Sequence, residues 1–170
     1  MDTPHQWRFF RSGGFDQVRL ETATDLKSLG ELDPKLWAAL SCPTSNLEFD
    51  SKTLEFIDTD ADSHIRVPEI IAAVNWITSL LKNAEDLTRG ADSLPLDAID
   101  DSTPEGMALL ASAKQILQNI GKHEEFAISI EDTADLNRIF ASTTFNGDGI
   151  IPPNAATDNE TQTVIEEIIL

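Results

Sequence analysis

Basic residues are scarce in this chain. Its 170 residues include 12 Lys and Arg against 30 Asp and Glu, so the formal net charge is −18. Nucleic acids and anionic membrane surfaces both attract proteins through Lys and Arg, and we therefore expect neither as a partner. An acidic surface suits cation binding, although its simplest consequence is solubility.

Cysteine and long apolar runs are scarce as well. Cys42 is the single cysteine, which excludes an intrachain disulfide and a disulfide-stapled secreted fold. No run of about eighteen apolar residues is present, so we expect no membrane span. The segment Met1–His5 lacks the basic and apolar regions of a signal peptide, which predicts a cytoplasmic protein. Because Thr163–Leu170 reads as an apolar helix up to its last residue, we expect a C-terminal remainder of the same chain to follow it.

The most informative stretch is a run of twelve residues that begins at Asp58, in which carboxylates recur at alternate positions. Asp58, Asp60 and Asp62 occupy the first, third and fifth positions, and Glu69 occupies the twelfth. Ca²⁺ takes about six to eight oxygen ligands at about 2.3–2.6 Å, and a tight loop presents alternate side chains to one ion. Position seven contributes a backbone carbonyl, here that of His64. The spacing therefore predicts a calcium site formed by these five residues.

This stretch, which we call the acidic loop (residues 58–69), resembles the calcium-binding loop of the EF-hand family. Apolar residues at helical spacing follow it and predict an exiting helix from Val67 to about Lys82, with Trp76 packed in the core. The resemblance implies a first EF-hand over residues 50–82. It also implies that Ile65, at position eight, runs extended and meets a partner strand.

Two positions of the acidic loop depart from the family pattern. Ser63 stands at position six, where the family has glycine, and a positive φ is less comfortable for serine. Arg66, at position nine, puts a cation beside the carboxylates. The alternative is an acidic turn that caps the next helix and binds no ion, but four carboxylates in one short loop repel each other when no cation is present.

A second stretch of twelve residues, which begins at Thr144, keeps part of the same pattern. Thr144, Asn146 and Asp148 stand at positions one, three and five, and the backbone carbonyl of Ile150 stands at position seven. Position twelve is alanine. The resemblance therefore implies a degenerate second EF-hand over residues 132–170, with a weaker metal site.

EF-hands generally pair through their position-eight residues, which implies contact between Ile65 and Ile151. The two loops are farther apart in the chain than in compact EF-hand pairs. The second stretch could instead be a Gly-rich turn in a small sheet, so both interpretations stay open.

The rest of the chain predicts short strands and helices. Ser12-Gly13-Gly14 lies between aromatic-rich runs and predicts an N-terminal β-hairpin. The aromatic residues of this hairpin could stack on nucleic-acid bases or pack in the core, and the net charge favours the core. Within the intervening helical segment 92–121, a capping box from Ser102 to Glu105 begins a helix that stops at Gly121.

Short alternating segments at Val18–Leu26, Leu96–Ser102 and Ile128–Leu136 share one pattern and could contribute to one small sheet. The predicted fold is mainly α (α+β). It consists of EF-hand helix-loop-helix units, which could form a distant pair, with an N-terminal β-hairpin and a small sheet in one EF-hand-containing domain over residues 1–170.

The function that these residues predict is calcium binding, with a structural rather than a sensory role, because the Met-rich groove of sensor proteins needs more than two methionines. Mg²⁺ could occupy the same loop, whereas zinc would need His and Cys ligands. An enzyme is not expected, since His5, His64 and His123 are scattered and no nucleophile–base set is evident. The alternative function is a protein-interaction domain that uses the EF-hand fold as a scaffold, with another protein or the C-terminal remainder as partner.

Overall fold

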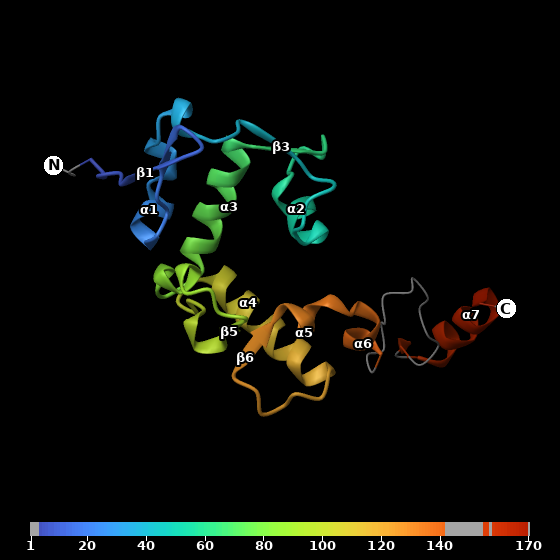
Figure 1. Ribbon diagram of the computed structural model, residues 1–170. Helices are drawn as coiled ribbons and strands as arrows, with labels where there is room; N and C mark the ends of the chain where they lie inside the picture. Colours follow the sequence, from blue (N-terminus) through green and yellow to red (C-terminus); the bar gives the residue numbers. More distant parts are fainter. Residues whose placement is uncertain (1–3, 142–154, 157, 170) are drawn as a thin grey trace. The chain divides into compact units, whose positions relative to one another are not determined.

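The computed structural model describes residues 4–141, 155, 156 and 158–169 (Figure 1). The described part contains seven α-helices and three two-stranded antiparallel sheets, which confirms a mainly α, α+β chain. The α-helices are α1 (Ala23–Lys27), α2 (Ser51–Ile57), α3 (Val67–Ser79), α4 (Pro104–Asn119), α5 (Ile130–Ala134), α6 (Leu136–Phe140) and α7 (Asn159–Ile169). The strands are β1 (Phe9–Ser12), β2 (Phe15–Val18), β3 (Ser41–Pro43), β4 (His64–Arg66), β5 (Ser93–Pro95) and β6 (Ala127–Ser129). The 3₁₀ helices are η1 (Leu29–Glu31), η2 (Pro34–Leu36), η3 (Ala84–Thr88) and η4 (Leu96–Ala98).

The chain forms two compact units, which we call unit 1 (Met1–Gly90) and unit 2 (Ala91–Leu170). The single EF-hand-containing domain over residues 1–170 stays a prediction. Among the described helices, none combines the length and the hydropathy that a membrane crossing requires.

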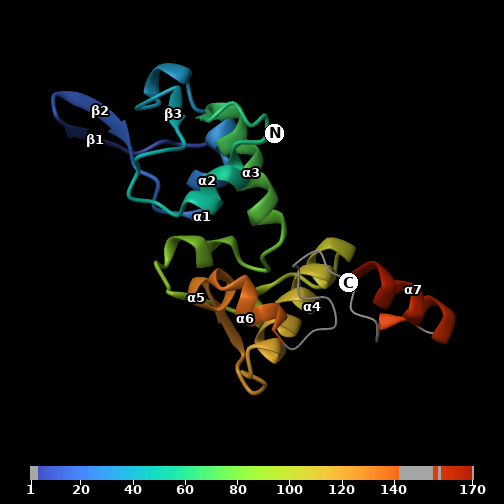
Figure 2. The same ribbon diagram turned by 90° about the vertical axis from the view of Figure 1, so that its right-hand side faces the viewer.

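In unit 1, β1 and β2 form the predicted hairpin around Gly13 and Gly14. Both glycines have positive φ, 59° and 86°, as a two-residue hairpin turn requires. The prediction that its aromatic residues pack in the core is wrong for Phe9 and Phe15, which are 50% and 74% exposed. The reason is that the hairpin extends away from the helices of its unit and has no second layer to cover it (Figure 2).

The N-terminal segment is fixed to α1 by the buried carboxylate of Asp25. One of its oxygens lies 2.9 Å from His5 Nε2, and the other accepts a hydrogen bond from Arg8 at 3.2 Å. The second oxygen also accepts the backbone N–H groups of Glu21 and Thr22. Burial by itself raises the pKa of Asp25, but these hydrogen bonds outweigh it and hold the pKa far below its usual range.

Helices α1 and α2 both pack against α3 and flank it in Figure 1. Helix α3 starts at Val67 as predicted, but it ends at Ser79 rather than near Lys82, and the buried Leu80 follows as its C-cap. The prediction that Trp76 lies in the core is wrong, because its side chain is 52% exposed. Trp76 follows Val74 by two residues, which turns it by about 200° to the other face of the helix.

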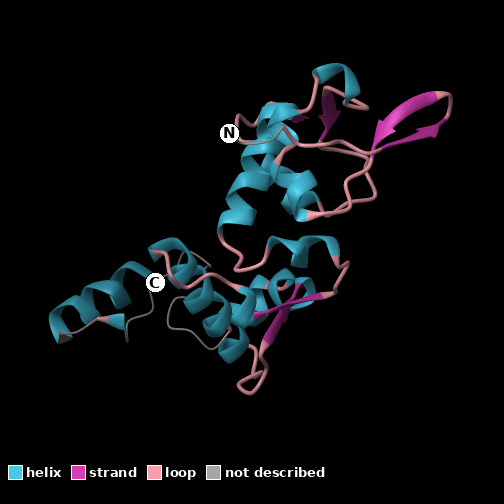
Figure 3. Cartoon of the chain, turned by 90° about the vertical axis from the view of Figure 1, so that its left-hand side faces the viewer, coloured by secondary structure: helices cyan, strands magenta, loops and turns pink. Residues whose placement is uncertain are grey.

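Unit 2 is built around α4 and the pair β5–β6 (Figure 3). Helix α4 begins one residue later than the predicted capping box, because the hydroxyl of Thr103 rather than Ser102 accepts the N–H of Gly106. Gly121 ends this segment with φ 83°, as predicted. The core of the unit comes from η4, α4 and their flanking residues: Leu96, Ile99, Ala113 and Leu117.

The single small sheet expected from three alternating segments is wrong for the described residues. The predicted segment Leu96–Ser102 begins with the 3₁₀ helix η4 and is no strand; β6 pairs instead with β5, which precedes it, and β2 pairs with β1 in a separate sheet. The strands have only three or four residues each, which is too short to extend a sheet further, so each pair stays isolated.

At the start of the predicted second EF-hand (residues 132–170), α5 and α6 are separated by Asp135, which has φ −101° and ψ 89°. The carboxylate of Asp135 caps α6 by accepting the N–H of Arg138 at 3.1 Å. The predicted second-site residues follow α6 and lie outside the described residues: Thr144, Asn146, Asp148 and Ile150. The weaker second site therefore stays a prediction.

Candidate metal centre

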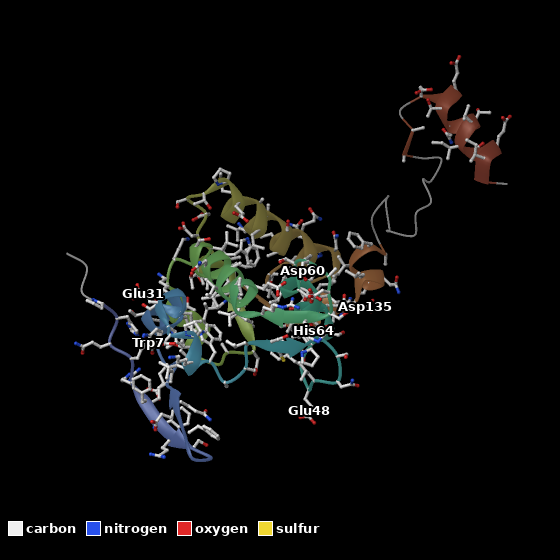
Figure 4. All side chains as sticks on the ribbon, turned by 90° about the horizontal axis from the view of Figure 1, so that it is seen from above. Trp7, Glu31, Glu48, Asp60, His64 and Asp135 are labelled. Carbon is white, nitrogen blue, oxygen red and sulfur yellow. The ribbon has the colours of Figure 1, made fainter. Side chains whose placement is uncertain are left out.

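The acidic loop lies between two helices whose ends are set by local chemistry. Asp50 caps α2 by accepting the N–H of Thr53 at 2.8 Å, and the helix ends at Ile57. Residues 58–63 then form turns, β4 follows, and α3 starts at position ten of the loop, where Pro68 is tolerated in the first helical turn. Figure 4 shows Asp60 and His64 on this segment.

The extended part of the loop is fixed by a partner strand, as predicted for Ile65. Ile65 is buried and pairs with Cys42 in the antiparallel pair β3–β4. The N–H of Thr44 donates to the carbonyl of Ser63 at 3.0 Å and extends this contact. The expected contact between Ile65 and Ile151 stays a prediction, because Ile151 lies outside the described residues.

Three of the four predicted carboxylates come together. Asp58, Asp60 and Glu69 each offer an oxygen, and these oxygens lie within 4.8 Å of one another. Two ligands on opposite sides of a Ca²⁺ ion at about 2.3–2.6 Å are separated by roughly 4.6–5.2 Å, so this spacing fits one ion. The donors are all hard, ionisable oxygens, which suits Ca²⁺ or Mg²⁺ and does not suit a metal that prefers sulfur or nitrogen.

Glu69 is held in place by neutral donors from both ends of the loop. Its Oε2 accepts the N–H of Arg66 at 2.8 Å, and its Oε1 accepts the N–H of Thr59 at 2.8 Å and the Thr59 hydroxyl at 3.2 Å. The N–H of Arg66 is the main reason that the pKa of Glu69 lies below its usual range, and the groups of Thr59 add to this effect. Glu69 therefore stays ionised at neutral pH, as a metal ligand must.

Asp58 is oriented by the turn that follows it. Its two oxygens accept the N–H groups of Asp62 at 3.2 Å and Ser63 at 2.9 Å. Asp60 also accepts the N–H of Asp62, at 3.2 Å. Hydrogen bonds from the backbone thus hold Asp58 and Asp60 in place without an ion. Less side-chain conformational entropy is therefore lost when an ion binds.

Asp62 does not belong to the cluster, although the sequence predicts it as a ligand. Its Oδ2 lies 2.6 Å from the guanidinium of Arg66, which also lies 3.8 Å from Asp60. The hydrogen bond from Arg66 is the main cause of the lowered pKa of Asp62. Arg66 therefore acts as a local cation that competes for two of the predicted ligands.

The other position that departs from the family pattern is Ser63, which lies in the turn between Ala61 and His64. Ser63 adopts φ 67°, and Ala61 adopts φ 56°, so the turn places two non-glycine residues in the left-handed region. His64 donates its N–H to Asp62 at 2.9 Å, and its ring Nδ1 lies 3.2 Å from the Asp62 carbonyl oxygen. The role of the His64 carbonyl as a ligand stays a prediction.

Sequence reasoning missed a loop of similar construction in unit 2, at residues 121–132. It follows α4, contains β6 and leads into α5, and Ile128 at its eighth position pairs with Leu94 of β5. No acidic alternation marks it in the sequence. The available signal was the spacing of Ser129 and Asp132, which repeats that of Arg66 and Glu69 directly after an isoleucine.

Comparison of the chain with protein-family models, with curated proteins and with solved structures finds no match.

Proposed function

We propose that the chain is a calcium-binding module in which one ion, held by the acidic loop, orders the surrounding part of unit 1. The observation that carries this proposal is the convergence of Asp58, Asp60 and Glu69 within 4.8 Å. Like charges at this separation repel each other, and a divalent cation converts that repulsion into attraction. The resemblance of the loop to an EF-hand points to the same ion, with Mg²⁺ as a competitor.

A structural role follows from the way in which the loop is anchored. The loop joins α2 to α3 and is paired with β3 through Ile65, so an ion that orders the loop also orders its contacts with these three elements. An ion that binds only the folded loop stabilises unit 1 by mass action. The weaker second site proposed at Thr144, Asn146, Asp148 and the Ile150 carbonyl would add to this function without being needed for it.

The test is a calorimetric Ca²⁺ titration of metal-stripped protein, repeated in the presence of Mg²⁺. We expect one site with an affinity on the order of micromolar. Asp58→Asn and Glu69→Gln should each weaken it at least tenfold, because each removes a cluster charge. Glu55→Gln is the matched control, since Glu55 is exposed on α2 and does not belong to the cluster.

Two results would separate the alternatives. An affinity that is unchanged in both cluster variants would move the site away from the acidic loop. The absence of heat at millimolar Ca²⁺ would leave the acidic turn that caps α3 as the better description.

Tryptophan fluorescence gives a second measurement of the same binding. Trp7, Trp37 and Trp76 are all in unit 1, so their fluorescence reports the unit that contains the acidic loop. We expect Ca²⁺ to raise the midpoint of urea unfolding that this signal follows, and Glu69→Gln to abolish most of the increase.

The second candidate function is a protein-interaction domain, which we keep because of exposed apolar side chains in unit 1. Phe49 and Phe56, next to and on α2, are 61% and 82% exposed. Large apolar groups gathered on a surface mark interaction sites. A protein that binds a partner equally well with and without Ca²⁺, and with Glu69→Gln, would favour this function over the first.

A further inference from the structure

The acidic loop and the loop of residues 121–132 correspond position by position. Each follows a helix, α2 or α4, and each has its strand at positions seven to nine and its next helix from position ten. In each, the eighth residue pairs with an antiparallel strand: Ile65 with Cys42, and Ile128 with Leu94. The two loops therefore place their twelfth residues in the same local setting.

The twelfth residue is a carboxylate in both loops and makes the same backbone contact. Glu69 accepts the N–H of Arg66 at 2.8 Å, and Asp132 accepts the N–H of Ser129 at 3.0 Å. Asp132 also accepts the Ser129 hydroxyl at 2.9 Å. The difference between the loops lies in what faces the remaining carboxylate oxygen.

In the loop of unit 2 that oxygen faces an ammonium group. Lys122 Nζ lies 2.7 Å from Asp132 Oδ1, and the Asp132 side chain is only 5% exposed. The hydrogen bond from Lys122 is the main cause of the lowered pKa of Asp132. A carboxylate buried to this extent needs a positive partner, because an unpaired charge in such a place is strongly destabilising.

We infer that the ammonium group of Lys122 is the built-in cation of the loop of residues 121–132, so that unit 2 orders this loop without a metal ion. The first, third and fifth positions of this loop are Gly121, His123 and Glu125, which do not repeat the three aspartates of the acidic loop. Lys122 is a positioning residue that acts through Asp132 on β6 and α5. This inference does not depend on calcium binding by unit 1.

The test is hydrogen exchange of the full chain, measured by mass spectrometry in metal-free buffer. Lys122→Met keeps most of the apolar stem and removes the charge. We expect the amides of residues 127–129 to exchange roughly a hundredfold faster in this variant, because the Asp132 carboxylate stays buried without its partner. Lys122→Arg should restore most of the protection. Lys114→Met is the matched control, since Lys114 is an exposed lysine on α4 with no ion pair among the described residues.

A paired variant distinguishes the charge interaction from packing. Lys122→Met combined with Asp132→Asn removes both charges and should regain protection, even if Lys122→Met alone fails to fold. The inference would be overturned if these amides exchanged as fast in the double variant as in Lys122→Met. It would also be overturned if they exchanged no faster in Lys122→Met than in the wild-type chain. A third result would overturn it: slower exchange of these amides when millimolar Ca²⁺ is added to the wild-type chain. A metal ion would then supply the positive charge that the inference assigns to Lys122.

Discussion

Asp25 is the most completely hydrogen-bonded buried carboxylate of unit 1, and its replacement by Asn gives a prediction that needs no ligand. Asn has the same shape, and its carbonyl can keep the N–H groups of Glu21 and Thr22, which both donate to Oδ2 at 3.0 and 2.9 Å. What Asn loses is the charge that attracts His5 and Arg8. Asp25→Asn therefore removes the negative charge of the side chain and keeps its capping hydrogen bonds.

The expected cost follows from the exposure of the partners. The Asp25 side chain is 3% exposed and that of His5 is 13% exposed, whereas Arg8 is about half exposed and regains water when the pair is lost. A hydrogen bond to a charged group contributes about 1.5–3 kcal/mol, and the exposure of Arg8 puts the loss near the lower end, at about 2 kcal/mol. Asp25→Ala also removes the cap and should cost about 1 kcal/mol more.

The assay is urea unfolding followed by tryptophan fluorescence, which reports unit 1. Trp7 reports directly on the surroundings of Asp25, because its ring packs edge-on against the ring of His5, with 4.4 Å between the ring centroids. The pKa of Asp25 is lowered in the folded state, so the stabilisation that its charge provides is present above about pH 4 and is lost as the pH falls through the folded pKa. The difference between wild type and Asp25→Asn should therefore be full at pH 6 and smaller at pH 2.5. A difference below about 0.5 kcal/mol at pH 6, or one that does not shrink in acid, would refute this reasoning.

Two further predictions concern the acidic loop. Arg66→Gln should tighten Ca²⁺ binding about three- to tenfold in calorimetry, because it removes a cation that lies 2.6 Å from Asp62 and 3.8 Å from Asp60. Arg11→Gln is the charge-matched control. Equal Ca²⁺ affinities of the two variants would contradict the proposed site in the acidic loop. Ser63→Gly should stabilise unit 1 by about 0.5–1 kcal/mol in urea unfolding, because it relieves a φ of 67°; a lower stability would show that the Ser63 side chain contributes more than its backbone strain costs.

The parts of the fold that depend on local chemistry could be predicted from the sequence. The Gly13-Gly14 turn and the Gly121 stop both appear where the residues predict them. The extended position of Ile65 was predicted as well. Each of these features is decided by the backbone preferences or hydrogen bonds of a few neighbouring residues.

Features that depend on distant partners could not be predicted. The strand that pairs with Ile65 includes Cys42, and nothing in the sequence of that segment marks it as a partner. The capture of Asp62 by Arg66 also escaped prediction, because the sequence gives the spacing of the two charges but not which of several acids the guanidinium reaches. The exposure of Trp76 shows that a large apolar residue on a short helix need not face the core.

Within the part of the chain that the structure describes, three carboxylates occupy the third position of a helix and accept the N–H of the residue that precedes that helix: Asp25, Glu69 and Asp132. Asp25 has His5 and Arg8 beside it, and Asp132 has Lys122. The described hydrogen-bond donors of Glu69 are neutral groups, and the nearest loop guanidinium is engaged by Asp62.

Glu69 also differs from the other two in its neighbours, since Asp58 and Asp60 add negative charge beside it. The same chain therefore neutralises two of these helix-start carboxylates with its own side chains and gathers acids around the third. An external cation lowers the free energy most where no internal cation pairs directly with the carboxylate and like charges are closest, and at Glu69 the one loop cation, Arg66, is paired with Asp62 instead. This contrast within one molecule supports placing the calcium ion at Glu69 more strongly than the acidic composition does, because the composition is shared by all three sites.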